Sequence, residues 1–378
     1  MRILIVSHFF HPFIGGLEEV ALQQAKNLVE MGHEVKVVTS RVGDEEELEM
    51  IHGIEVHRVP ASDFLYRNLD IPQPLFNIFE LNRLLKRLVP ESDVVHIHDR
   101  FYLSSFLATR VAKKFDKPIV LTIHVGLVSY ENPLYRLLFQ INEIFSSYVV
   151  KNASKIISVG DEIKEYISNK FKRPSLSISN AVEIDFYNSN INNETLLKSD
   201  DFKVLFVGRF TYKKGVDIIL EVAERFDGDV QFICVGDGPK MSEIKEIMKK
   251  KNIENMKLTG MISERDKLRD YYISSDVLIF TSRRGEASSP LVILEALASG
   301  LPVLVMNTGG HARIIDNGVT GFVVEDLEDL IDKIRILRDN RNILKEMSMN
   351  ARIEAEKYTW SRNVEKLISV YKAAVDYQ

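Results

Sequence analysis

The sequence predicts an α/β protein with two doubly wound domains of largely parallel strands. Three observations support this fold class. The chain has 378 residues, which exceeds the length at which a single hydrophobic core usually keeps growing. Short Val- and Ile-rich runs alternate with helical patterns, as in parallel strands joined by crossover helices. The alternation stops at a polar stretch, residues 188–201, and then restarts, so we expect a linker there.

The first domain, residues 1–187, is predicted to open with a βαβ unit. Its helix, 17–31, has a mostly apolar stripe at helical spacing that includes Val20, Ala25 and Leu28. Gly32 follows the helix, where a left-handed cap belongs. Strands are expected at 3–6, 35–39, 94–97, 119–123 and 156–159. Because these runs are almost entirely apolar, we expect the sheet to be buried on both faces.

The second domain, residues 202–358, repeats this organisation. Helices are expected at 215–225, 241–250 and 291–299, and strands at 202–207, 230–235, 277–280, 303–305 and 322–324. A final amphipathic helix, 359–378, carries the only tryptophan, Trp360.

Composition excludes several classes of protein. Hydrophobic content of 45% and charged content of 27% are typical of a soluble globular protein. A net charge of -5 disfavours a dedicated nucleic-acid binder. Cys234 is the only cysteine, so neither an intrachain disulfide nor a thiolate metal site is expected, as suits a reducing cytoplasm. No signal peptide or membrane span is expected, so any membrane contact should be peripheral.

A basic turn after the first strand of the second domain is a candidate anion site. Ligands of open parallel sheets bind beyond the carboxyl ends of the strands, where helix N-termini supply amides. Arg209 and Lys214 lie there, and a guanidinium with an ammonium group suits a diphosphate. The alternative is a solvated basic turn.

Two glutamates follow a later strand of the same domain. Glu295 lies in an apolar helical run, where an unpartnered carboxylate would be costly. Its partner is either a pair of sugar hydroxyls or a nearby arginine. Glu286 precedes it in a loop that contains Ser288, Ser289 and Pro290.

In the first domain, glycines and histidines follow predicted strands. Gly15 and Gly16 precede the first helix, where a backbone without side chains lets a bound group approach closely. His8, His96, His98 and His124 lie near strand ends. They make a metal site conceivable, but alternate strand residues point to opposite faces and no carboxylate motif joins them. We therefore interpret His124 as a strand-end residue that faces the cleft between the domains.

Together these motifs resemble the family-four glycosyltransferases, and the resemblance covers nearly the whole chain. The matching segments occur in the family's order: Gly15-Gly16 with Glu18, His124, Asn180-Ala181-Val182-Glu183, Gly208-Arg209, Lys214-Gly215, Gly236-Asp237-Gly238-Pro239, Gly260, Glu295-Ala296, Gly300-Leu301-Pro302-Val303, Gly309-Gly310 and Tyr358-Thr359-Trp360.

The resemblance implies the GT-B architecture, in which two Rossmann-like doubly wound domains face a central cleft and the last helix rejoins the first domain. It implies a retaining, metal-independent hexosyl transfer from a nucleoside diphosphate sugar to a hydroxyl acceptor, without another cofactor. Arg209 and Lys214 would hold the diphosphate, Glu295 the ribose and Glu286 the transferred sugar. The other donor-binding positions implied are Gly15, Gly16, Gly260, Leu291 and Val292. The catalytic residues implied are His124, Glu286, Arg209 and Lys214.

One feature departs from the family pattern. Eight residues separate Glu286 from Glu295, whereas the family has seven, so strict alignment places Ala287 at the first position. We expect the loop to absorb the extra residue. Two alternatives remain open: a GT-B sugar-nucleotide 2-epimerase and a non-catalytic sugar-nucleotide binder.

The acceptor side of the reaction is less specified. A basic amphipathic helix is expected at 75–89, with Arg83, Lys86 and Arg87 on its polar face. It either rests on the inner membrane face, where a lipid-linked acceptor would lie, or packs on the core with a solvated face. The base, the sugar, the acceptor and the oligomeric state stay open.

Overall fold

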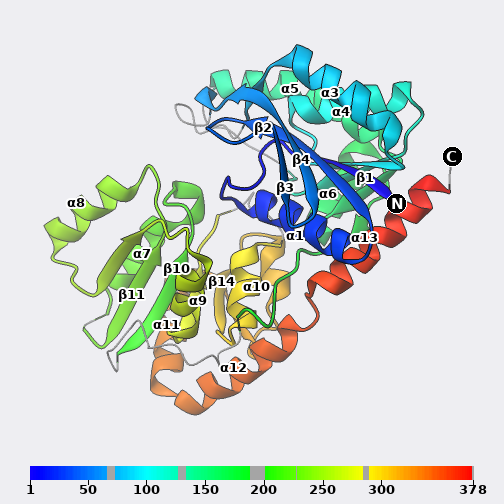
Figure 1. Cartoon of the computed structure of the whole chain (residues 1–378). Coiled ribbons are helices and arrows are strands. Elements are labelled where there is room, and N and C mark those ends of the chain that lie inside the picture. Colours follow the sequence, from blue (N-terminus) through cyan, green and yellow to red (C-terminus); the bar gives the residue numbers. More distant parts are fainter. Residues whose placement is uncertain (66–72, 127–132, 188–200, 227, 284–288, 377–378) are drawn as a thin grey trace. The chain divides into compact units, whose positions relative to one another are not determined.

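The chain forms two compact units in a computed structural model, which describes residues 1–65, 73–126, 133–187, 201–226, 228–283 and 289–376 (Figure 1). The N-terminal unit comprises residues 1–180 and 360–378, and the C-terminal unit comprises residues 181–359. The units therefore divide near residue 180. Of the linker expected at 188–201, residues 188–200 lie outside the described residues. No described helix is long and apolar enough to cross a bilayer.

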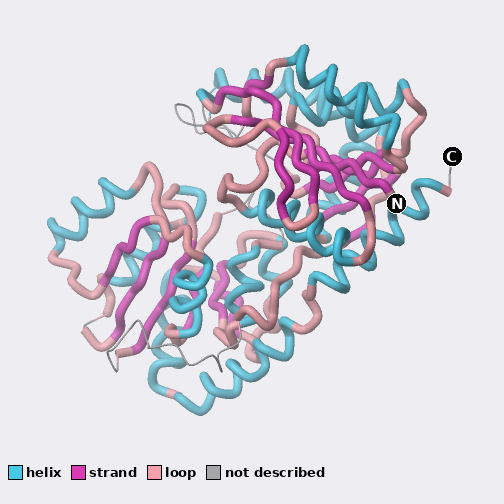
Figure 2. The backbone as a smooth tube through the Cα atoms, viewed as in Figure 1, coloured by secondary structure: helices cyan, strands magenta, loops and turns pink. Residues whose placement is uncertain are grey.

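The sheet of the N-terminal unit has the order β3-β4-β2-β1-β6-β7-β8-β9, with β5 paired to β4 (Figure 2). All neighbours are parallel except the pairs β3–β4 and β4–β5. The strands are β1 (Arg2–Val6), β2 (Glu34–Arg41), β3 (Leu48–Ile51), β4 (Ile54–Ser62), β5 (Leu75–Phe76), β6 (Val94–His98), β7 (Ile119–Ile123), β8 (Lys155–Ser158) and β9 (Leu176–Ser177).

Helices cover both faces of this sheet. They are α1 (Gly16–Glu30), α3 (Ile78–Glu91), α4 (Leu103–Lys114), α5 (Pro133–Asn152), α6 (Asp161–Phe171) and α13 (Trp360–Val375). One core cluster joins α3, α4, α5 and α6 to the sheet, and a second joins α1 and α13 to its other face. Every residue of β6 and β7 is buried, as expected from their largely apolar sequences.

The predicted helix at 75–89 begins too early. Leu75 and Phe76 form β5, and the helix α3 starts at Ile78 because Asn77 caps it: the Asn77 side chain accepts a hydrogen bond from the Glu80 amide at 3.3 Å. The β3–β4 hairpin was not predicted. Its signal was present, since Ile54 and Val56 alternate with charged residues just after His52 and Gly53, which both have positive φ.

The C-terminal unit contains a fully parallel sheet in the order β12-β11-β10-β13-β14-β15. Its strands are β10 (Phe202–Val207), β11 (Val230–Val235), β12 (Met256–Gly260), β13 (Val277–Phe280), β14 (Val303–Met306) and β15 (Gly321–Val324). Two short 3-10 turns, η1 (Tyr212–Lys214) and η2 (Gly310–Ile314), follow β10 and β14.

The helices of this unit also lie on both faces of the sheet. They are α7 (Val216–Ala223), α8 (Met241–Lys251), α9 (Arg265–Ile273), α10 (Leu291–Ala298), α11 (Leu327–Asp339) and α12 (Arg341–Ala355). One core cluster includes α7, α8 and α11, and another includes α9 and α10, while α12 contributes to both. The predicted α/β class with two doubly wound sheets is confirmed.

Candidate functional site

The strand order of the C-terminal unit reverses between β10 and β13. From β10 the chain proceeds outward to β11 and β12, and then returns to β13 on the other side. At such a reversal the loops after the two adjacent strands diverge and leave room for a ligand beyond their carboxyl ends. These are the loops that contain Arg209, Lys214 and the segment before α10, so the fold brings the predicted motifs to one edge of the sheet.

The basic turn after β10 has a defined shape. Thr211 begins the 3-10 turn and its hydroxyl accepts a hydrogen bond from the Lys214 amide at 3.4 Å. Gly215 then adopts φ of 70°, and a Cβ at this position would lie 2.2 Å from the Thr281 carbonyl oxygen. Only glycine fits this backbone, which brings the end of β10 against the end of β13.

Two residues after β13 fasten this turn. The Thr281 hydroxyl donates to the carbonyl oxygens of Lys214 and Gly215 at 2.9 and 3.1 Å. The Arg283 guanidinium forms two hydrogen bonds with the Asp217 carboxylate at 2.9 and 2.7 Å and lies 3.8 Å from the Tyr212 ring centroid. Neither residue was predicted from the sequence. The one feature of the sequence that could have indicated them is that they directly follow a buried strand.

Arg209 and Lys214 lie at opposite ends of the turn. Arg209 is exposed directly beyond β10, while Lys214 is half-buried, with its ammonium 5.9 Å from the Phe280 ring centroid. Phe210 between them is fully buried, and its amide donates to the Asp237 carbonyl at 2.9 Å. The buried phenyl ring therefore anchors the turn.

Glu295 is half-buried on α10 and has a partner that the sequence did not reveal. The Tyr272 hydroxyl of α9 donates to the Glu295 carboxylate at 2.7 Å. Burial, together with the negative charge of Glu295, raises the pKa of Tyr272 well above its ordinary value, so the phenol stays protonated. Tyr272 is fully buried and thus fixes the direction of one carboxylate oxygen.

The other predicted donor positions of this unit lie around the same edge. Leu291 and Val292 form the start of α10, where Pro290 supplies no side-chain cap for the first amides. Gly260 ends β12 and its carbonyl accepts the Gly236 amide at 3.0 Å. Glu286 and its neighbours 284–288 lie outside the described residues, so the expected loop bulge stays a prediction.

The N-terminal unit has its own reversal of strand order, between β1 and β6. The loop after β1 leads to Gly15, which precedes α1. A Cβ on Gly15 would lie 2.1 Å from a Glu18 carboxylate oxygen, whereas a Cβ on Gly16 would meet no heavy atom within 4 Å. Gly15 thus makes room for a folded-back Glu18, and Gly16 leaves open space.

Four buried histidines surround this reversal. His98 Nδ1 and His124 Nε2 are 3.1 Å apart, and the His8 ring stacks on Tyr102 at 3.5 Å. Burial lowers the pKa of His124 to about 4 and, with neighbouring histidines, holds the pKa of His8 and His98 well below their ordinary value. The imidazoles are therefore neutral near neutral pH and act as hydrogen-bonding groups without charge.

Neighbouring polar groups fix the backbone and the rings of this cluster. Asp99 has φ of 63°, and its carboxylate accepts the Arg100 amide at 2.8 Å and hydrogen bonds from the backbone of His124 and Val125. His96 is bonded to Thr122 and to Tyr371 of α13, at 2.8 and 2.7 Å.

Among the described residues, no group of three or more His, Cys, Asp or Glu side chains is arranged to hold a metal ion.

Family models match most of the sequence. Residues 14–186 match the model described as Glycosyltransferase Family 4, and residues 188–354 match the model described as Glycosyl transferases group 1. Together the two matched regions include the glycine loop, His124, Arg209, Lys214 and Glu295.

Similar proteins extend over the full length of the chain. It is 25% identical to an uncharacterized glycosyltransferase of Methanocaldococcus jannaschii, over all of this chain and 99% of that protein. It is 24% identical to the alpha-monoglucosyldiacylglycerol synthase of Acholeplasma laidlawii, over all of this chain and 98% of that protein. The structure of Anabaena HepE in complex with UDP-glucose superimposes with a TM-score of 0.80 at 18% identity, over 99% of this chain and all of HepE.

Proposed function

Because this chain belongs to the family-four glycosyltransferases, we propose that its C-terminal unit grips the diphosphate of the donor with Arg209 and Lys214. The protein is a glycosyltransferase of the GT-B fold that takes its sugar from a nucleotide-sugar donor. The observation that carries the proposal is the basic turn at the β10–β13 reversal, which Thr281 and Arg283 tie to the end of β13.

The chemistry of this turn suits the leaving group. When the bond between the anomeric carbon and the diphosphate breaks, negative charge grows on the diphosphate. A guanidinium and an ammonium held in place before the reaction would stabilise that charge as it develops. The first amides of α10, at Leu291 and Val292, would add dipoles of the same sign.

The nucleoside and the sugar have further candidate contacts. We assign Glu295 to the ribose hydroxyls, because Tyr272 orients its carboxylate and a carboxylate accepts hydrogen bonds from a diol. Gly260 would lie against the base, and Glu286 would orient the hydroxyls of the transferred sugar. Transfer proceeds with retention and without a metal ion in this proposal, through an oxocarbenium-like transition state.

In the N-terminal unit we assign Gly15, Gly16 and His124 to the reacting end of the donor. The open space at Gly16 supports close approach of a bound group. The neutral His124 ring, held by His98, would donate or accept one hydrogen bond without repelling an incoming hydroxyl. The acceptor is a hydroxyl compound.

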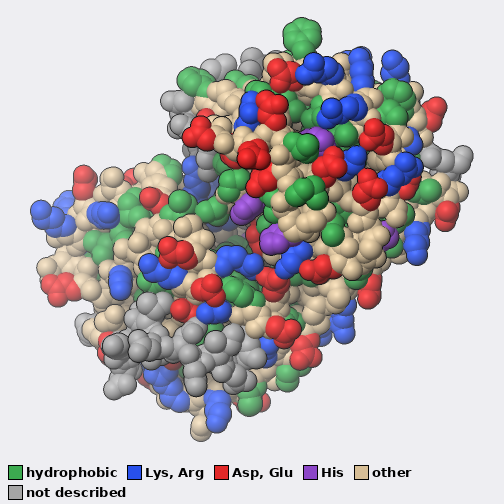
Figure 3. Space-filling model, viewed as in Figure 1, with side chains coloured by type: hydrophobic (Ala, Val, Ile, Leu, Met, Phe, Trp, Pro, Cys, Tyr) green, Lys and Arg blue, Asp and Glu red, His purple; other side chains and the backbone are tan. Residues whose placement is uncertain are grey.

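The apolar side of α3 packs on the core, so only its exposed basic residues support a lipid-linked acceptor, with the protein peripheral at the inner membrane face. The α3 helix buries Leu81, Leu85 and Leu88 and exposes basic residues, and Figure 3 shows Lys and Arg side chains over the helices labelled α3 and α4 in Figure 1. The similar Acholeplasma enzyme is named for a glycolipid product.

Donor binding and turnover test this assignment. The wild-type chain is screened by thermal shift against UDP-, GDP- and ADP-hexoses, beginning with UDP-glucose because HepE binds it; a ligand that binds only the folded chain raises its melting temperature. Donor consumption is then compared among wild type, Arg209→Ala, Lys214→Ala and His124→Ala. Lys249→Ala on the exposed face of α8 is the control.

We expect Arg209→Ala and Lys214→Ala to lower turnover by about a hundredfold or more, with unchanged unfolding midpoints. The control should match wild type. Full activity in either variant would show that the substituted residue does not hold the donor. A free epimerised sugar nucleotide formed without acceptor would favour the 2-epimerase, and binding without any donor turnover would favour a non-catalytic binder.

A further inference from the structure

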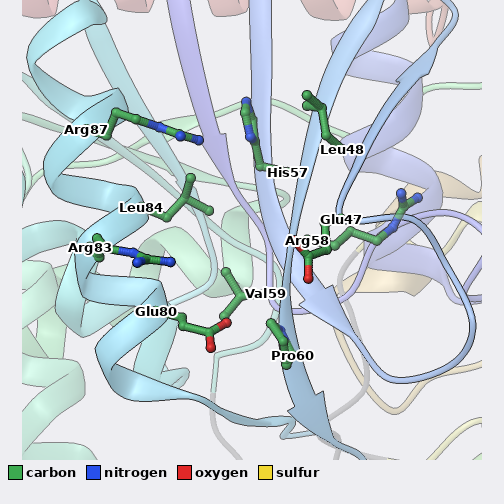
Figure 4. Close-up of a pocket in the computed structure, with 10 residues that line it drawn as sticks. All are labelled: Glu47, Leu48, His57, Arg58, Val59, Pro60, Glu80, Arg83, Leu84 and Arg87. Carbon is green, nitrogen blue, oxygen red and sulfur yellow. The ribbon is translucent and has the colours of Figure 1, made fainter.

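A pocket of about 600 Å³ lies in the N-terminal unit, between α3 and the β3–β4 hairpin (Figure 4). Its position follows from the strand order, because β4 is near the edge of the sheet and α3 covers only part of its face. The lining residues come from the hairpin and from one side of α3: Glu47, Leu48, His57, Arg58, Val59, Pro60, Glu80, Arg83, Leu84 and Arg87.

Two arginines dominate one wall of this pocket. Arg83 and Arg87 are one helical turn apart on α3 and reach toward β4, from which His57 and Val59 face them (Figure 4). Both are exposed, and within the described part of the chain neither forms a hydrogen bond or an ion pair. Arg87 lies close enough to His57 to lower the pKa of that imidazole, after burial, which is the larger cause.

The acidic residues around the pocket already have partners. Glu47 pairs with Arg41 at 3.1 Å, and Glu80 accepts the Asn77 side-chain amide at 3.0 Å. Glu55, beside His57, is bonded to that ring at 2.5 Å and lies 3.6 Å from Lys36.

The third arginine is also engaged. Arg58 pairs with Glu49 at 2.6 Å and donates to the His11 carbonyl at 2.8 Å. Within the described part of the chain no carboxylate forms an ion pair with Arg83 or Arg87, and the one lining carboxylate bonded only to a neutral amide is that of Glu80.

We propose that this pocket binds the phosphate group of a phosphate ester, held between Arg83 and Arg87. Guanidinium groups form paired, charge-assisted hydrogen bonds with phosphate oxygens, and two of them one turn apart suit a single tetrahedral anion. The pocket is larger than a phosphate ion, and Leu48, Val59 and Leu84 add apolar side chains to its lining. The organic part of the ester packs against these apolar side chains.

The pocket shares no residue with the donor site assigned above, and its lining residues belong to the N-terminal unit, whereas Arg209 and Lys214 belong to the C-terminal unit. The proposal therefore stands whether or not Arg209 and Lys214 hold the donor. The same phosphate chemistry can come from a free ester or from a lipid headgroup.

Phosphate binding is measured on the full chain through the imidazole resonances of His57, assigned with a His57→Asn variant. This readout is local, so that phosphate bound at Arg209 and Lys214 does not register. The probes are inorganic phosphate and glycerol 1-phosphate. Arg83→Gln/Arg87→Gln is compared with Lys86→Gln/Lys114→Gln, which removes the same charge from exposed positions on α3 and α4 outside the pocket.

We expect saturable shifts in the wild type and the control, and binding weakened by about tenfold or more in the arginine variant. Equal binding by the arginine variant, an equal loss in the control, or no saturable shift in the wild type would each overturn the proposal. Co-sedimentation with phosphatidylglycerol and phosphatidylcholine vesicles identifies the source of the phosphate. Binding to the anionic vesicles that needs Arg83 and Arg87 indicates a lipid headgroup, and binding of the soluble probes alone indicates a free ester.

Discussion

At the scale of single residues, backbone conformation sets how closely the loops pack, and burial sets the pKa of the ionisable groups. Gly215 and Gly236 have φ of 70° and 138°, and a Cβ on either would lie within 2.2 Å of a carbonyl oxygen of another segment. These glycines let the loops after β10 and β11 pack closely. In the N-terminal unit, burial shifts the pKa of Glu18 and of the histidines around it in opposite directions.

Gly215→Ala should lower the free energy of unfolding by about 2 kcal/mol or more, because alanine is strained at this φ and its methyl group meets the Thr281 carbonyl. Urea unfolding measures the change. Gly228→Ala is the control, since no heavy atom lies within 4 Å of its Cβ and its φ is not left-handed, and its effect should stay within about 1 kcal/mol. Equal effects of the two substitutions would show that the Gly215 backbone tolerates a side chain.

Glu18→Gln should change the dependence of stability on pH. Burial raises the pKa of Glu18 from 4.5 to about 7, so the folded chain keeps a proton that the unfolded chain has lost between these values. The stability of the wild type therefore falls as pH rises through this range, and the variant lacks this loss. Between pH 4.5 and about pH 7, the free energy of unfolding of the variant should rise by on the order of 3 kcal/mol relative to that of the wild type. Parallel curves of unfolding free energy against pH would contradict the shifted pKa.

At the scale of elements, the caps and the neighbouring strands set helix boundaries that periodicity leaves open. The apolar pattern of α3 extends back to Leu75, but Leu75 and Phe76 pair with β4 and Asn77 begins the helix. Burial of Leu81, Leu85 and Leu88 sets the rotation of α3 and leaves Arg83 and Arg87 toward β4.

Asn77→Ala should destabilise the chain by about 1 kcal/mol, because the Glu80 amide loses its side-chain acceptor. Thermal unfolding of the variant is compared with Asn77→Asp, which keeps an acceptor oxygen and should stay close to wild type. A destabilisation as large in the aspartate variant would indicate that the Asn77 donor to Glu80 matters more than the cap.

At the scale of the whole molecule, the chain ends in the unit where it began. The α13 helix packs against α1 and buries Val364, Leu367, Val370 and Tyr371, and the Tyr371 hydroxyl is bonded to His96 of β6. Folding of the N-terminal unit is therefore completed by residues that follow the whole C-terminal unit in sequence.

Leu367→Ala should lower the stability of the N-terminal unit by about 2–5 kcal/mol. The Leu367 side chain is only 1% exposed, so its removal leaves a cavity in the core. Hydrogen exchange should rise in β1 and β6 and stay unchanged in β10 and β13. Met349→Ala, at an exposed position of α12, is the control. Equal acceleration of exchange in both sheets would mean that the units unfold together.

The sequence by itself determined the α/β class, most of the parallel strands and the family motifs, because buried strands and strand-end turns leave local signals. Arg209, Lys214 and Glu295 were predicted in this way. The tertiary structure decided which side chains support them: Tyr272 reaches Glu295 from another helix, and Arg283 reaches the basic turn from another strand. It also decided that Arg83 and Arg87 face β4 without acidic partners. Such contacts join residues distant in sequence, so no local pattern specifies them, and only packing brings them together.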